Sequence, residues 1–193
     1  MPDESAAPLA ALRDVDASQI VLRKPSWRSG LHDLVAGETL VGRLDVSSWS
    51  GGSDAEAADG HWRFERPRGL TARTVRVLSV ADAREVAVVR RAKGGRQAEL
   101  ELDGHRYELR AHGWWKPRWT WTEGADELGI VTARDTFRGE RGRVELTELG
   151  LASPHASLLA LLGAHLAFLS NREGNAAAAA GATAATTAGA ASG

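Results

Sequence analysis

The segment SPHASLLALLGAHLAFLSNREG, residues 153–174, constrains the fold of this chain more than any other stretch. Ser153 suits a helix N-cap, Pro154 suits the first helical position, and the asparagine and glycine at the far end can close the last turn. We therefore predict a helix over about 154–171. Its large side chains occupy every side of the helical wheel: Leu158, Leu159, Leu161, Leu162, Leu166, Phe168 and Leu169. A helix that is apolar all round is enclosed either by protein or by a membrane.

The length of the apolar run decides between these two environments. From Ala156 to Leu169 it is 14 residues long and includes His165, whereas a bilayer span needs about 20 apolar residues. We therefore predict that protein encloses the helix and that the chain has no transmembrane span. His165 is predicted to be a core or helix-end histidine with a hydrogen-bond partner.

The residues before this helix form about ten short segments in which apolar and polar side chains alternate, a pattern typical of half-buried strands. The segments are QIVLR (19–23), TLVGRLDV (39–46), HWRFERP (61–67), TVRVLSV (74–80), EVAVVRRA (85–92), AELELD (98–103), HRYELRA (105–111), RWTWTE (118–123), ELGIVTA (127–133) and RVELTEL (143–149). Asp103-Gly104 separates two of these runs by the two residues that a type I′ hairpin requires. Short strands with short connections predict an antiparallel barrel or sandwich, and the single apolar helix favours a barrel closed around it.

One domain accounts for most of the chain. Residues 1–17 are predicted to be a flexible lead-in, and residues 18–172 the barrel with its central helix. Residues 173–193 contain no large side chain, so they bury too little surface to offset the entropy of ordering. We predict that this tail is disordered.

Several kinds of chemistry are excluded or not indicated. The chain has no cysteine, which excludes disulfides, thiolate metal sites and cysteine nucleophiles. The acidic N-terminus has no basic region followed by an apolar core, so no secretory signal is predicted and a cytoplasmic location is expected. The six histidines lack metal-binding spacing, and no nucleophile elbow, P-loop or dinucleotide motif is present. We therefore predict no catalytic residue, no cofactor and no metal site.

Charge is distributed unevenly along the chain. Residues 61–118 carry 14 basic and 7 acidic side chains, whereas residues 1–60 carry 5 and 10, and residues 119–193 carry 5 and 8. This cationic middle third can attract an anionic partner. The alternative is internal neutralisation, with basic strands beside acidic strands in one sheet.

Two motifs in the cationic third are candidate binding sites. The first is RRAKGGR, whose cations on a glycine-containing turn could hold a phosphate, because guanidinium groups match phosphate oxygens. Its candidate anion-binding residues are Arg90, Arg91, Lys93 and Arg96. The alternative is a solvated edge hairpin whose charges prevent strand pairing.

The second motif is HGWWKPRWTW, residues 112–121. Exposed tryptophan beside cations suits a membrane interface or stacking on bases. Trp119 and Trp121 are two residues apart on a predicted strand, so both are expected inside the barrel. Pro117 places a turn at the surface. The candidates on this turn are Lys116 and Arg118 for anions and Trp114 and Trp115 for aromatic contact.

The order of these features resembles the tubby C-terminal-like superfamily, which includes the LURP-one-related proteins and the phospholipid scramblases. The strand pair DGHRYELR, the segment WWKPRWTWTEGADELGIV and the helix PHASLLALLGAHLAFL carry the resemblance, and bacterial LURP-one-related proteins are the most similar type. The resemblance implies a 12-stranded barrel threaded by its C-terminal helix. Members act at membranes, where they bind phosphoinositides or are implicated in lipid movement. No residue here matches their functional positions.

Together these observations predict a mainly β fold, a closed antiparallel β-barrel of about 10–12 strands around one hydrophobic C-terminal α-helix. The expected function is non-catalytic: binding of an anionic partner, such as phospholipid head groups, by a cytoplasmic protein at a membrane surface. The alternative is a protein-interaction scaffold without a lipid ligand, and an enzyme is a third, less favoured, hypothesis. Nucleic acid is not expected as a partner.

Overall fold

The structure is a computed structural model of the chain, and it describes residues 8–17, 19–25, 30–47, 52–67, 73–113, 117–133 and 140–190. The described residues form twelve strands and three helical segments. The strands are β1 (Ile20–Arg23), β2 (Leu31–Ala36), β3 (Thr39–Val46), β4 (Ser53–Ala57), β5 (Gly60–Glu65), β6 (Thr74–Ser79), β7 (Glu85–Arg91), β8 (Gln97–Leu102), β9 (His105–His112), β10 (Arg118–Glu123), β11 (Asp126–Ala133) and β12 (Glu140–Leu146). The helical segments are η1 (Leu12–Asp14), α1 (Glu148–Ala152) and α2 (Ala156–Ala190).

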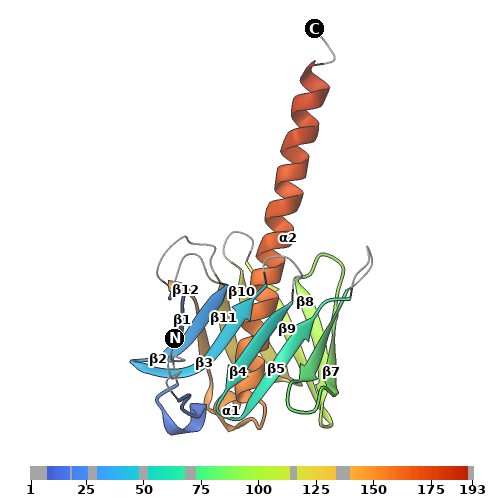
Figure 1. The fold of residues 1–193 in the computed structure, drawn as a ribbon. Coiled ribbons are helices and arrows are strands. Elements are labelled where there is room, and N and C mark those ends of the chain that lie inside the picture. Colours follow the sequence, from blue (N-terminus) through green and yellow to red (C-terminus); the bar gives the residue numbers. More distant parts are fainter. Residues whose placement is uncertain are drawn as a thin grey trace.

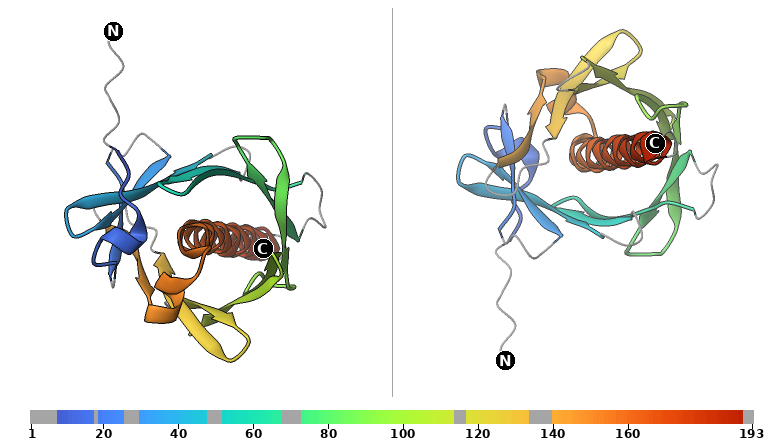
Figure 2. Two further views of the ribbon diagram at one scale, coloured as in Figure 1. Left: turned by 90° about the horizontal axis from the view of Figure 1, so that it is seen from below. Right: turned by 90° about the horizontal axis from the view of Figure 1, so that it is seen from above.

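All twelve strands belong to one closed antiparallel barrel. Each strand pairs with the next along the chain, and β1 pairs with β12 to close the ring. Seen along its axis, the ring of strands surrounds α2 (Figure 2). The predicted mainly β fold, its closed barrel and its central C-terminal helix are therefore confirmed.

The turn between β8 and β9 has the predicted chemistry. Asp103 and Gly104 both have positive φ angles, 49° and 83°, which a type I′ turn requires at its two central positions. Leu102 pairs with His105 on either side of the turn. The tight connection places Asp103 at the barrel end, where α2 begins.

The interior is filled by the apolar helix and the inward-facing strand residues. The helix leucines are buried on all sides: Leu158, Leu159, Leu161, Leu162 and Leu166 are each at most 2% exposed. Trp119 and Trp121 are 2% and 1% exposed, so both line the interior as predicted. The Trp121 indole Nε1 donates a hydrogen bond to the Leu159 carbonyl oxygen at 2.9 Å.

Glycine lets the helix approach the barrel wall closely at one point. A Cβ atom on Gly163 would lie 2.7 Å from Trp121 Nε1 and 2.8 Å from Val131 Cγ2. Carbon atoms do not pack at these distances, so any larger residue has to displace the wall. This contact fixes the depth at which α2 lies against β10 and β11.

His165 lies inside the barrel with one hydrogen bond, as predicted. It is 2% exposed, and its Nδ1 lies 2.8 Å from the hydroxyl of Ser53. The ring also packs against Phe64, with a centroid separation of 5.2 Å. Burial, reinforced by the charges of Arg91 and Arg172, lowers the pKa of His165 to about 3.

The lowered pKa of His165 predicts that the protein loses stability on acidification. Because the unfolded chain takes up this proton near pH 6.5 and the folded chain only near pH 3, the unfolded state binds more protons between these values. The free energy of unfolding should therefore fall as the pH drops from 6.5 toward 3. Above pH 6.5, His165 should not make the stability depend on pH. Thermal melts from pH 7.5 to 4 should show this slope, and His165→Asn should flatten it. His61→Asn, at an exposed position, is the control, and an equal flattening there would contradict the assignment.

The two ends of the chain differ from the predicted lead-in and tail. Of the lead-in, residues 8–17 lie against the barrel, because Ala10 N–H donates to the Leu40 carbonyl at 3.0 Å and both Leu12 and Ala17 are buried. At the other end, the helix was expected to stop near residue 171, but α2 continues to Ala190 (Figure 1).

The physical reason for the longer helix is its alanine content. Ten of the seventeen residues from 174 to 190 are alanine, the residue with the highest helix propensity. The buried part of α2 already supplies the nucleus, so the extension carries no nucleation cost. The backbone is therefore helical in a segment predicted to be disordered from its lack of large side chains.

Candidate functional site

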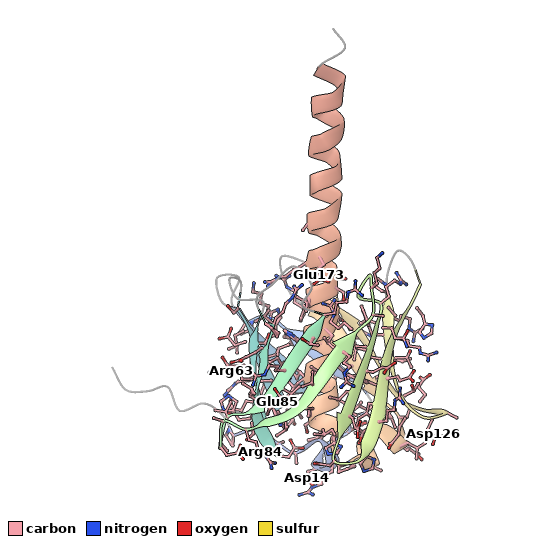
Figure 3. All side chains as sticks on the ribbon, turned by 90° about the vertical axis from the view of Figure 1, so that its right-hand side faces the viewer. Asp14, Arg63, Arg84, Glu85, Asp126 and Glu173 are labelled. Atoms are coloured by element: carbon pink, nitrogen blue, oxygen red, sulfur yellow. The ribbon has the colours of Figure 1, made fainter. Side chains whose placement is uncertain are left out.

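The barrel has two ends with different chemistry. We call the end at which α2 leaves the barrel the upper end, and the end that carries α1 and the start of α2 the lower end (Figure 1). The connections β1–β2, β3–β4, β5–β6, β7–β8, β9–β10 and β11–β12 belong to the upper end, and the intervening turns belong to the lower end. In Figure 3, Glu173 marks the upper end, whereas Asp14 and Arg84 lie toward the lower end.

Basic and acidic residues are divided between these ends. The six upper connections contain ten Lys or Arg residues and one Asp in the sequence, and five of the cations lie in described residues. These five are Lys24, Arg66, Arg73, Lys93 and Arg96. The lower turns and the first residue of α1 contain five acidic residues and one arginine: Glu38, Asp59, Asp82, Asp103, Glu148 and Arg84. Barrel topology therefore turns an irregular charge pattern along the sequence into a cationic end and an anionic end.

The structure brings the two predicted binding motifs together. The Arg96 guanidinium donates to the Gly113 carbonyl oxygen at 2.5 Å and to the Ala111 carbonyl oxygen at 3.4 Å. In return, the Ala111 N–H donates to the Arg96 carbonyl oxygen at 2.8 Å. The RRAKGGR turn thus lies directly beside the chain that leads into the tryptophan-rich turn. The first motif therefore adjoins the described start of the second, although the two are separate in sequence.

We call the cationic surface at the upper end the basic rim. It consists of five exposed cations at the upper ends of β7 and β10 and in the β5–β6 and β7–β8 connections: Arg90, Arg118, Arg73, Lys93 and Arg96. Within the part of the chain that the structure describes, none of the five forms an ion pair. These positive charges are therefore available to an external anion.

The cations lower on the outer wall behave differently. Arg63 pairs with Asp54 at 2.8 Å, and Arg76 pairs with Glu85 at 2.5 Å. Farther round the barrel, exposed charges are joined in the same way in the pairs Arg106–Glu99 and Arg110–Glu108. The sequence raised two alternatives for these cations, internal neutralisation and attraction of an anionic partner. The cations of the wall are neutralised by neighbouring carboxylates, whereas those of the basic rim are not.

Arg91 is the exception among the predicted anion-binding residues. Its side chain is only 5% exposed and makes two hydrogen bonds to the Glu173 carboxylate, at 2.8 and 3.0 Å. Successive residues of a strand face opposite sides, so Arg90 and Arg91 cannot both point outward. Arg91 points inward, where it holds α2 and does not meet a solvent anion.

Glu173 ties the helix to the barrel at the upper end. Besides Arg91, it pairs with Arg66 at 2.9 Å. The hydrogen bonds from Arg91 lower the pKa of the Glu173 carboxyl, with a smaller contribution from the charge of Arg66. Arg172 donates to the Ser47 carbonyl oxygen at 3.2 Å. These contacts fix the point at which α2 passes through the rim.

The remaining candidates of the tryptophan-rich turn, Trp114, Trp115 and Lys116, lie outside the described residues. By sequence, the upper connections contain four of the seven tryptophans, at positions 27, 49, 114 and 115. A signal for this end was therefore present in the sequence, as tryptophans and cations that recur in alternate connections. Only the topology shows that those connections share one end.

Beside the rim, the outer faces of β9, β10 and β11 form a shallow groove of about 540 Å³. Arg110, His112 and Arg118 line its upper part. Glu108 and Glu127 line its lower part, next to the lower turns. The groove therefore changes from cationic to anionic along its length, in the same direction as the barrel itself.

A partly buried polar network lies at the lower end and was not predicted from the sequence. The Tyr107 hydroxyl lies 2.9 Å from His155 Nδ1 and 3.4 Å from the Ser153 hydroxyl. On its other side, His155 Nε2 lies 3.2 Å from the Asp103 carboxylate. Burial raises the pKa of Tyr107, so its hydroxyl stays protonated and is a weak nucleophile. The network holds side chains in place and does not activate one.

Metal binding and membrane spanning find no support in the described residues. Among them, no three histidine or carboxylate side chains converge in a way that could hold a metal ion. None of their helices combines the length and apolar character needed to cross a bilayer. Comparison of the chain with protein-family models, curated proteins and solved structures gives no match.

Proposed function

We propose that this chain is a non-catalytic, tubby-like barrel that binds the anionic head groups of a membrane surface through its basic rim. It would act as a cytoplasmic protein at the periphery of the membrane. The observation that carries the proposal is the concentration of exposed, unpaired cations at one end of a barrel whose described wall cations are largely paired. The barrel around a C-terminal helix supports the tubby-like assignment.

The electrostatics favour a defined orientation on such a surface. A lysine or arginine near an anionic leaflet contributes about 1 kcal/mol to the free energy of membrane binding. The five rim cations could therefore contribute about 5 kcal/mol, before the entropy lost on binding is subtracted. The acidic lower turns are repelled by the same surface. The protein should therefore approach the membrane with its upper end.

Sedimentation with liposomes tests the proposal. The wild-type protein should bind vesicles that contain anionic lipid and not purely zwitterionic vesicles, and binding should weaken as salt increases. A triple variant, Arg90→Gln, Lys93→Gln and Arg118→Gln, should bind anionic vesicles about 100-fold more weakly, because three contributions of about 1 kcal/mol are lost.

The matched control removes the same charge from other exposed positions. Arg13→Gln, Arg84→Gln and Arg106→Gln lie off the rim and should leave binding within about threefold of wild type, since surface charges remote from the contact are screened. Equal binding of the wild type to anionic and zwitterionic vesicles would refute the proposal. An equal loss in the control triple would show that net charge, and not the rim, attracts the protein.

A second candidate function is protein interaction without lipid. The observation that favours it is the complementarity of the two ends, since a cationic rim can meet the acidic lower end of another copy. Such a head-to-tail contact would not close on itself and would extend into a filament. If the chain self-associates in this way, sedimentation velocity at low salt would show association that depends on concentration. If it binds lipid instead, the protein would sediment as a monomer.

A further inference from the structure

The lower end of the barrel contains a cavity of about 510 Å³ that is independent of the basic rim. The β4–β5 turn, the start of β7, the β8–β9 turn and the first turn of α2 surround it. A cavity of this size admits a ligand of small-molecule dimensions. Its wall combines an indole ring and apolar side chains with three carboxylates, the guanidinium of Arg84 and the imidazole of His155.

The apolar part of the wall is formed by Trp62 together with Leu102 and Leu158. Gly60 leaves room for the Trp62 ring, because a Cβ atom on Gly60 would overlap the ring, within 2.8 Å of three of its carbons. The ring is half-buried, so it is held by its surroundings and still borders the cavity. An indole face in this position attracts a cation through its quadrupole.

The charges around the cavity leave a negative excess. Glu85 is neutralised by Arg76 at 2.5 Å, and Arg84 lies 3.7 Å from Asp82. Asp59 is exposed and has no charged partner among the described residues. Together with Asp103, it provides negative charge that an incoming cation would neutralise. An anionic ligand would meet two carboxylates instead.

The same partly buried network positions Asp103 at the edge of the cavity. When His155 Nε2 carries the ring proton, it donates to Asp103, and His155 Nδ1 accepts the hydrogen bond of the Tyr107 hydroxyl. The Ser153 hydroxyl can then donate to the Tyr107 oxygen. Each hydrogen bond of this chain then has one donor and one acceptor. Within the described chain, the second oxygen of Asp103 has no partner, so it can accept a bond from a ligand.

We propose that this cavity binds a small organic cation, an amine or quaternary ammonium group on an apolar body. Asp59 and Asp103 would face the charge, Trp62 would cover one side of it, and Leu102 and Leu158 would contact the apolar body. A metal ion fits the cavity poorly, because no three ligating side chains converge within the described residues. The proposal does not depend on membrane binding by the rim.

Isothermal titration calorimetry with three probes of one shape tests the site: phenethylamine, the neutral 2-phenylethanol and the anionic phenylacetate. We expect a Kd of about 0.1–1 mM for phenethylamine, because a ligand with so few atoms gains little binding free energy. 2-Phenylethanol and phenylacetate should bind at least about tenfold more weakly. Asp59→Asn, Asp103→Asn and Trp62→Leu should each weaken amine binding about three- to tenfold. Asparagine tolerates the positive φ angle of the β8–β9 turn, so the Asp103→Asn variant keeps its fold.

Glu38→Gln is the matched control, because it removes one negative charge from a lower turn that does not border the cavity. It should leave amine binding unchanged, as should the rim triple variant. The proposal is overturned if the amine does not bind at about 10 mM, a range in which even weak ligands register. Equal affinity for 2-phenylethanol would overturn it as well. So would a loss in Glu38→Gln as large as that in Asp59→Asn.

Discussion

Leu162→Asp should abolish soluble expression of this protein. Leu162 is 0% exposed, on the middle of a helix that the barrel surrounds. The substitution removes a buried leucine, which costs about 2–5 kcal/mol, and places a carboxylate in an apolar interior, which costs several more. The sum is comparable with the whole stability of a domain, about 5–15 kcal/mol. Soluble yield and a circular dichroism melt measure the effect.

Leu149→Asp is the control for this prediction. Leu149 is a leucine of α1 that is 55% exposed, so the same change of side chain should cost under about 1 kcal/mol. Near-normal folding of Leu162→Asp would mean that α2 is not the core of the barrel. Failure of both variants would mean that the chain does not tolerate added acid anywhere near its C-terminal helices.

Gly163→Leu should lower stability by about 3–5 kcal/mol, or the melting temperature by roughly 10–15 °C. A side chain at this position meets the Trp121 indole and Val131 at less than 3 Å. Both neighbours are buried in the wall, so they have no solvent space to move into. Displacing the indole also breaks its hydrogen bond to Leu159, which leaves a buried donor unpaired.

Gly174→Leu makes the same substitution in the same helix without the contact. Nothing lies within 4 Å of the Cβ position of Gly174, which is exposed. Leucine has the higher helix propensity, so this variant should be stabilised by up to about 0.8 kcal/mol. The difference in melting temperature between Gly163→Leu and Gly174→Leu measures the stability lost to overpacking at position 163. Equal melting temperatures would show that α2 is not pressed against β10 and β11.

The sequence predicts the architecture well because the barrel is encoded locally. Period-two alternation correctly predicted that Trp119 and Trp121 face the interior. The dipeptide Asp103-Gly104 correctly predicted the turn between β8 and β9. The helix is apolar on all sides, which predicted that the strands close around it as a barrel. The end of that helix was not predicted, because burial alone does not reflect the helix propensity of the alanines after Gly174.

The candidate site was predicted only in part, since its geometry depends on which strand ends meet. Arg90 and Arg91 were both predicted to bind an anion, but strand alternation turns them to opposite sides and the structure shows that Arg91 faces inward. The contact of Arg96 with Gly113 joins two motifs that are separate in sequence. The histidine network and cavity at the lower end unite residues 59, 103 and 155, and no local pattern relates such distant positions.

The barrel is electrically polarised along its axis. Antiparallel strands place alternate connections at opposite ends, so a sequence with cations in one set and acids in the other gives two unlike surfaces. The same helix that fills the core leaves through the cationic end. Proposed membrane contact at one end and a proposed cation site at the other thus follow from one arrangement of charge.

The most direct test of the central claim is to compare the two ends on a membrane. The chain has no cysteine, so single cysteines at Ala92 of the β7–β8 connection and Ala81 of the β6–β7 turn, both exposed, can carry an environment-sensitive fluorophore. With anionic vesicles, we predict a blue shift and protection from aqueous quencher for the label at position 92, and neither for the label at position 81. A response only at position 81, equal responses at both, or none at either would contradict the claim.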